Sequence, residues 1–237
     1  GCRPRARRPG QQRPPAGPAP RPPRRRAGAP DQHDGGILSQ TGINGAGLGL
    51  FGSFVVSANW RFALPSRNFV RRHVLEQPTI DAAVAAMSRL SSRASGHNVM
   101  LADRSGRVAD IESTPEDFRV LGARDGLLAH TNHYCHPELA PRDALRTSSL
   151  ADFADDSHRR LARVHSRLAA LPARVTSADV QALLRDHEGH PKSVCRHPDG
   201  DPTETLSACS VVLVPDAREM SVTVGNPCER APVWYRL

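Results

Sequence analysis

The sequence predicts an α+β fold in which sheets and helices pack as a sandwich, and three observations support this. Short apolar stretches are joined in pairs by turns that contain Gly or Asp, which indicates antiparallel hairpins. Other segments place apolar residues every three or four positions, which indicates amphipathic helices. Hairpins and helices are interleaved along the chain, an order typical of α+β domains.

Strands are expected where apolar and β-branched residues flank a turn. The expected pairs are 37–41 with 48–57, 98–102 with 108–112, 118–121 with 127–131, and 208–214 with 220–224, and a last strand is expected at 233–235.

Three segments are expected to be helical. Thr79 can cap a helix whose apolar residues are Ile80, Ala83, Val84, Met87 and Leu90. A long amphipathic helix is expected from Leu150 to Leu171, with an outer face rich in Arg, and a shorter one at 177–185.

The chain divides into two regions of different composition near residue 36. Residues 1–36 contain nine Arg, nine Pro and two Asp, and Ala is their one aliphatic type. Such a segment cannot bury enough apolar surface to offset its chain entropy, so we expect 1–36 to be disordered. Residues 37–237 have the composition of a globular domain, and most of the net charge of +8 lies outside them.

Composition also limits the environment of the protein. No apolar run reaches the length of a membrane span. The five cysteines are odd in number and widely spaced, which does not suggest a disulfide framework, so a cytoplasmic location is expected.

Histidines and cysteines are concentrated in two windows, 130–136 and 187–197. Imidazole and thiolate groups are zinc ligands, but the spacing matches no common zinc signature. We therefore interpret these histidines as strand-end and loop residues, and expect neither a metal nor a cofactor.

Several short motifs together resemble the acyl-coenzyme A:6-aminopenicillanic acid (isopenicillin N) acyltransferase family. They occur in the family's order from about residue 36 to the C-terminus: Gly-Ile-Asn-Gly-Ala-Gly-Leu at 42–48, Arg-His-Val-Leu-Glu at 72–76, Arg-Ala-Ser at 93–95, His-Thr-Asn-His at 130–133, Ser-Val-Cys-Arg at 193–196, and Thr-Leu at 205–206. The fourth and fifth motifs, about 60 residues apart, are the most specific.

The resemblance implies the four-layer αββα sandwich of N-terminal-nucleophile hydrolases, here incomplete at its N-terminal strands. It also implies self-cleavage at a Gly-Cys bond that exposes a cysteine as both nucleophile and N-terminus. A terminal amine has a pKa of about 8, so near neutral pH it can accept the thiol proton. The thiolate then attacks an amide or acyl-CoA-like thioester and forms an acyl-enzyme, which water or an amine resolves.

The family's site residues can be carried over motif by motif. Cys2, preceded by Gly1, matches the nucleophile, and Asn132 matches the side-chain amide that stabilises the oxyanion. For Asn44, Ser193 and Arg196 the implied role is substrate binding. The alternatives are that Asn44 ties down a turn and that Ser193 and Arg196 bond a neighbouring strand.

Two segments depart from the family pattern. Cys2 is followed by Arg3-Pro4 and further Arg, where the family has a small hydroxyl residue and a strand. Residues 201–204 occupy the region of a family Arg. One hypothesis is that residues 1–36 are translated from another reading frame of a GC-rich gene, which would leave the body as an inactive remnant.

Binding through the N-terminal segment is the competing function. Its Arg clusters would attract nucleic acid or another acidic partner, as salt-sensitive phosphate contacts do. The segment has no aromatic residue for base stacking, so nucleic-acid binding is the weaker hypothesis. The sequence does not indicate the oligomeric state.

Overall fold

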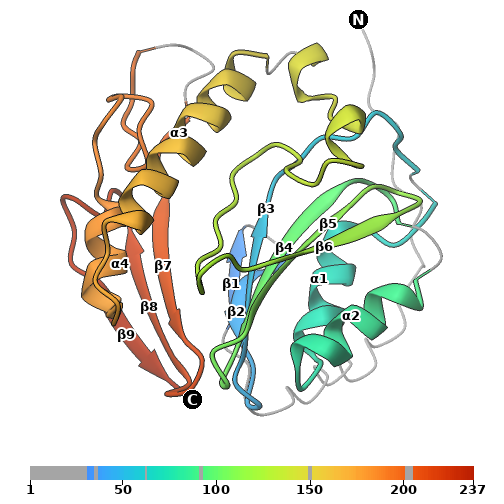
Figure 1. The fold of residues 1–237 in the computed structure, drawn as a ribbon, viewed down its shortest axis with the longest axis horizontal. Helices are drawn as coiled ribbons and strands as arrows, with labels where there is room; N and C mark the ends of the chain where they lie inside the picture. The colour runs from blue at the N-terminus through green and yellow to red at the C-terminus, as the bar shows by residue number, and fades with distance from the viewer. Residues whose placement is uncertain (1–30, 35–36, 62, 91–92, 149–150, 201–204) are drawn as a thin grey trace, which may run out of the picture.

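The computed structural model describes residues 31–34, 37–61, 63–90, 93–148, 151–200 and 205–237. These residues form two antiparallel sheets and four α-helices, which confirms the α+β class (Figure 1). The strands of the larger sheet are β1 (Asp31–Asp34), β2 (Ile37–Ile43), β3 (Leu48–Ser53), β4 (His97–Asp103), β5 (Val108–Ser113) and β6 (Phe118–Gly122), and they pair in sequence order.

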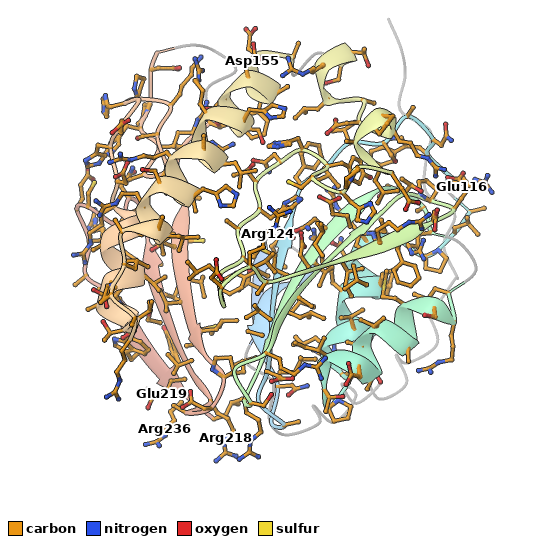
Figure 2. All side chains as sticks on the ribbon, viewed as in Figure 1. Glu116, Arg124, Asp155, Arg218, Glu219 and Arg236 are labelled. Carbon is orange, nitrogen blue, oxygen red and sulfur yellow. The ribbon has the colours of Figure 1, made fainter. Side chains whose placement is uncertain are left out.

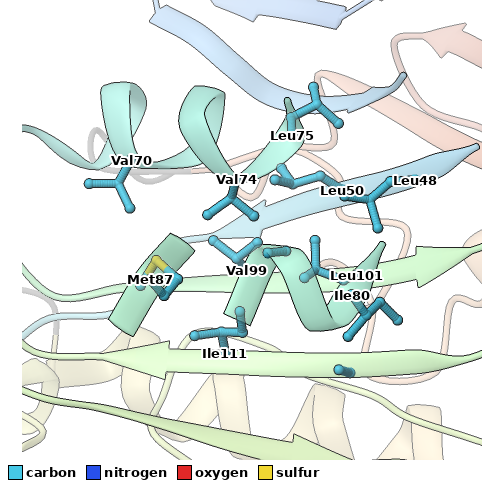
Figure 3. Close-up of a cluster of buried hydrophobic side chains, with 12 residues drawn as sticks. Leu48, Leu50, Val70, Val74, Leu75, Ile80, Met87, Val99, Leu101 and Ile111 are labelled. Atoms are coloured by element: carbon cyan, nitrogen blue, oxygen red, sulfur yellow. The ribbon is translucent and has the colours of Figure 1, made fainter. Parts of the chain in front are cut away.

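Helices α1 (Arg67–Leu75) and α2 (Ile80–Ser88) connect β3 to β4 and cover one face of the larger sheet. Side chains of successive strand residues point to opposite faces, and Leu48, Leu50, Val99, Leu101 and Ile111 all belong to the core formed with these helices. Figure 3 shows these side chains against Val70, Val74, Leu75, Ile80 and Met87. Thr79 caps α2 as predicted, since its hydroxyl accepts from the Ala82 amide at 3.2 Å.

The smaller sheet contains β7 (Cys209–Val214), β8 (Glu219–Val224) and β9 (Val233–Arg236). In Figure 1 it faces the larger sheet, with α4 (Ser177–Leu184) beside β7 on its outer side and α3 (Ala151–Ala169) running diagonally across the upper part of the view. Figure 2 shows Glu219 and Arg236 together at one end of this sheet, where their charged groups lie 3.6 Å apart.

The glycine-rich turn between β2 and β3 lies where the two sheets meet. Gly47 has a φ of +80°, and a Cβ there would lie 2.8 Å from the Pro215 carbonyl oxygen after β7. Both the backbone conformation and the close approach require glycine.

The structure differs from the predicted elements in several places. Helix α1 (Arg67–Leu75) was not predicted at all. Residues Asp31–Asp34 pair with β2, although they belong to the segment expected to be disordered. Residues 127–131 were expected to form a strand, and this is wrong, since the chain there makes only an isolated bridge between Arg124 and Leu127. Instead, His130 bonds Glu112 on β5 and the Asn132 amide bonds Ser157 on α3, so this part of the chain does not continue as a strand. Residues 1–30 lie outside the described part of the chain.

None of the described helices is long and apolar enough to span a membrane.

Candidate active site

The segment 130–136, which carries His-Thr-Asn-His, lies between the larger sheet and α3, because its ends bind Glu112 on β5 and its middle binds Ser157 on α3. Four of its backbone amides are fixed by side chains. The amides of Cys135 and His136 donate to the Glu112 carboxylate at 2.6 and 2.8 Å. The Tyr134 amide donates to Asp143 at 2.9 Å, and the Asn132 amide donates to the Ser157 hydroxyl at 2.8 Å. The segment therefore has a defined course without belonging to a sheet.

Beneath this segment, a buried pair joins His130 to the larger sheet. Nε2 of His130 lies 2.8 Å from Glu112, and its Nδ1 lies 3.1 Å from the Ser53 hydroxyl. Asp110, on the same strand as Glu112, lies 3.9 Å from Nε2. All these charged side chains are almost completely buried.

The pKa values in this cluster reflect burial and mutual pairing. Burial alone lowers the pKa of His130, but interactions with Cys135, Glu112 and Asp110 outweigh it and raise this pKa to about 10. Burial raises the pKa of Asp110 to about 6. Burial opposes ionisation of Glu112 as well, but bonds from His130 and two backbone amides lower its pKa overall. The structure thus favours a His130 cation beside a Glu112 anion.

Asn132 is half-buried, and its side-chain amide is held in one orientation. Its Oδ1 accepts from Nη2 of Arg160 at 2.8 Å, and its Nδ2 donates to the Phe54 carbonyl oxygen at 3.1 Å. An amide nitrogen carries two hydrogens. The nitrogen donates one of them to the Phe54 carbonyl oxygen, and the other is available for a second acceptor.

Asn132 belongs to a charged network that also contains Arg196. The fully buried Asp156 carboxylate, on α3, pairs with Nε of Arg160 at 3.0 Å and with Nη1 of Arg196. Both guanidinium groups lie over the Phe153 ring, at 5.3 and 5.6 Å from its centroid. Two cations share one anion here, so the network carries a surplus positive charge.

A cavity of about 220 Å³ opens beside this network. Three of its polar lining residues are Arg160, Ser193 and Arg196, and its apolar lining residues are Phe153, Val194 and Leu206. The hydroxyl of Ser193 itself donates to the Cys195 carbonyl oxygen at 2.5 Å and so shapes the loop. The structure therefore brings Ser193, Arg196 and, through Arg160, Asn132 to one place.

Other cavities flank the same helix. One of about 250 Å³ is lined by His133 and His158, whose rings stack at 3.7 Å. A larger one, of about 620 Å³, lies between α3 and residues 188–192 and shares Arg160. Asn132 lines none of these three cavities, but it bonds Arg160 and adjoins His133 in sequence.

Asn44, another of the predicted site residues, lies elsewhere. The amide of Asn44 donates to the carbonyl oxygens of Leu75 and Gln77 at 2.7 and 2.8 Å, and accepts from the amides of Ala46 and Leu48 at 2.9 and 3.0 Å. Its hydrogen-bonding capacity is thereby used to hold the turn, so these contacts favour the structural alternative. Cys2 lies outside the described residues.

Sequence reasoning missed Asp156 and Arg160. Their signal is present in the spacing of α3, because Phe153, Asp156, Ser157 and Arg160 recur at three- and four-residue intervals on one helical face. Charged residues on the buried face of an amphipathic helix are unusual and point to a partner.

The fold places this site in a known structural class. The chain is similar to penicillin V acylase from Agrobacterium tumefaciens, with a TM-score of 0.60 and 17% identity over 85% of this chain and 67% of that one. It is also similar to a mutant of conjugated bile acid hydrolase from Clostridium perfringens, with a TM-score of 0.55 and 13% identity over 84% and 77% of the two chains. The fold is thus shared with N-terminal-nucleophile hydrolases.

The family follows from the sequence itself. The model of the acyl-coenzyme A:6-aminopenicillanic acid acyl-transferase family matches residues 36–229, and the chain belongs to that family. Among proteins with curated descriptions, none matches the chain.

Proposed function

We propose that this chain carries the acyl-transfer chemistry of its family, acting on an N-acyl amide or an acyl thioester through a cysteine acyl-enzyme. The fold we propose is the four-layer αββα sandwich, because α1 and α2 cover one face of the larger sheet and α4 contacts the smaller sheet that faces it.

The observation that carries this proposal is the fixed amide of Asn132. Arg160 donates to its oxygen, which fixes the orientation of the amide. Its nitrogen donates one of its two hydrogens to the Phe54 carbonyl oxygen. The remaining N–H is a preorganised donor, as oxyanion stabilisation requires. Removal of one such donor typically slows acyl transfer about 10²- to 10³-fold.

The cavity at Ser193 and Arg196 is proposed to bind the acyl donor. Its apolar residues suit an acyl chain, and the surplus positive charge of Arg160 and Arg196 suits a donor with a carboxylate or phosphate group. Cys2 is the proposed nucleophile because it follows Gly1, as in the family's cleavage site.

The test uses the full chain and an activated N-acyl or ester substrate. Intact-mass measurement and peptide mapping should find Gly1 removed and an acyl group on Cys2. Asn132→Asp should slow acylation about 10²- to 10³-fold, because it retains the oxygen that binds Arg160 but offers no donor and places negative charge near the oxyanion. Exposed Asn59 provides the control, and Asn59→Ala should acylate at the wild-type rate.

Two outcomes would contradict the proposal. A wild-type chain that shows neither cleavage nor adduct is the inactive remnant. A normal acylation rate in Asn132→Asp would remove this amide from the chemistry even in an active chain.

A further inference from the structure

Four potential metal ligands converge outside the candidate active site. His187 follows α4, Cys195 and His197 lie in the long connection from α4 to β7, and Cys228 lies between β8 and β9. One ligand atom from each lies within 4.8 Å of the ligand atoms of the other three. We propose that these residues bind one zinc ion in a closed Cys2His2 site.

Four of the six distances between the ligand atoms are close to those of a tetrahedron around zinc. With typical Zn–S and Zn–N bonds, the edges should be about 3.3 Å for N–N, about 3.6 Å for N–S and about 3.8 Å for S–S. His187 Nε2 lies 3.1 Å from His197 Nε2, and this second nitrogen lies 3.6 Å from Cys195 Sγ and 3.4 Å from Cys228 Sγ. The two sulfurs are 3.5 Å apart.

Ligand chemistry distinguishes zinc from the alternatives. Two thiolates and two imidazoles favour zinc over magnesium or calcium, which prefer oxygen. A Cys195–Cys228 disulfide needs sulfurs about 2.05 Å apart, well below the 3.5 Å observed. Two thiolates also neutralise the charge of a divalent ion, so the site requires no further anion.

The surroundings of the ligands resemble the outer shell of a zinc site. Nδ1 of His197 faces the Glu229 carboxylate at 3.8 Å, while Nε2 faces the other ligands. The Asn226 amide donates to Cys195 Sγ at 3.6 Å. Carboxylates beside ligand histidines and N–H donors toward thiolates orient zinc ligands in this way.

A second group, Glu112, His130 and Cys135, also brings ligand atoms together. Its carboxylate already accepts from His130 and from two backbone amides. That group is therefore satisfied within the protein, and we assign the metal to the first group.

The proposed zinc would be structural, because four protein ligands leave no open position. Among the described residues of 185–208 there is no helix or strand, and loops of this length need anchors. Zinc would tie this loop to the β8–β9 connection. Cys195 stands between Ser193 and Arg196, so the metal would also fix the cavity wall. The metal site does not depend on the acyl chemistry proposed above.

The test is metal analysis of the reduced, full-length chain produced with zinc in the medium. We expect about one zinc per chain, and replacement with Co(II) should give the absorption of tetrahedral cobalt with thiolate charge-transfer bands. Peptide mapping after alkylation should show Cys195 and Cys228 protected by zinc and reactive after its removal. These measurements need no substitution, so they decide the matter even if a variant fails to fold.

Variants then identify the ligands. His187→Ala and Cys228→Ser alter exposed ligands and should lose the zinc, whereas His190→Ala and Cys209→Ser should retain it. His190 is the sharper control, because its ring lies only 5.1 Å from that of His197. Substoichiometric zinc in the wild type, a Cys195–Cys228 disulfide, or zinc retained in both ligand variants would overturn the proposal.

Discussion

The two sheets of the molecule are stabilised in different ways. The larger sheet and its helices enclose a continuous core of twelve buried apolar residues. In the smaller sheet only Val212 and Met220 are buried apolar residues, and all of β9 is exposed. The smaller side instead has charged and polar links, such as Arg163 with Asp186 and Arg196 with Asp156.

This difference explains where the candidate site lies. Asn132 is anchored through its segment to the larger sheet, and Arg160 and Arg196 belong to the side with polar links. The site therefore joins a rigid apolar half to a half whose geometry depends on a few specific bonds. Predictions that separate the two halves test this view.

The largest effect is expected at the Glu112–His130 pair in the larger half. Glu112→Gln leaves His130 without its charged partner and should lower the free energy of unfolding by about 3 to 5 kcal/mol near pH 6. Chemical denaturation measures it. Glu138→Gln is the control, since this carboxylate pairs with Arg119 at the surface and should cost less than about 1 kcal/mol.

The same pair should make stability depend on pH in a defined direction. The folded pKa of His130, about 10, lies above its ordinary value of 6.5, so the folded state holds a proton that the unfolded state releases. This stabilisation is complete below pH 6.5 and is lost as the pH rises toward 10. Asp110, with its pKa of about 6, has already titrated below this window. Glu112→Gln should flatten the decline, and an unchanged slope would contradict the assignment.

At the junction between the halves, Asp156→Asn should lower the free energy of unfolding by about 3 kcal/mol. The substitution leaves the guanidinium groups of Arg160 and Arg196 without their shared, buried anion. Its neighbour Asp155 provides a matched control. Asp155 pairs with Arg146 at the surface, so Asp155→Asn should cost less than about 1 kcal/mol. Equal shifts of the midpoint for the two variants would show that the network contributes no more than a surface pair.

Most elements were predictable from the sequence because they depend on local patterns. Thr79 caps α2 and Thr176 caps α4, at the helix starts that periodicity indicated. In α4 the Thr176 hydroxyl accepts from the Asp179 amide, and the Asp179 carboxylate accepts from the Thr176 amide. The β4–β5 hairpin follows from two apolar stretches on either side of the Asp-Arg-Ser-Gly turn at 103–106. The conformation of 127–131 depends instead on bonds to Glu112 and Ser157. Both residues are distant in sequence, so no local pattern could reveal this conformation.

The sites were only partly predictable for the same reason. The motifs indicated Asn132, Ser193 and Arg196, but not that Arg160 connects Asn132 to Asp156. The histidine-rich window at 187–197 did not match a zinc signature, because Cys228 follows His197 by 31 positions and arrives from another sheet connection. Ligands gathered by tertiary structure leave no fixed spacing to recognise.

The last comparison makes the same substitution, Leu to Ala, once in each half of the molecule. Leu50→Ala removes a fully buried side chain from the core of the larger sheet and should cost about 2 to 5 kcal/mol. Leu213 lies on β7, is only partly buried and packs toward Gly49. Its neighbours can relax and water can enter, so Leu213→Ala should cost about 1 kcal/mol. Thermal or chemical denaturation gives both values. A cost at Leu213 as large as that at Leu50 would mean that apolar packing, rather than polar and metal links, stabilises the smaller half.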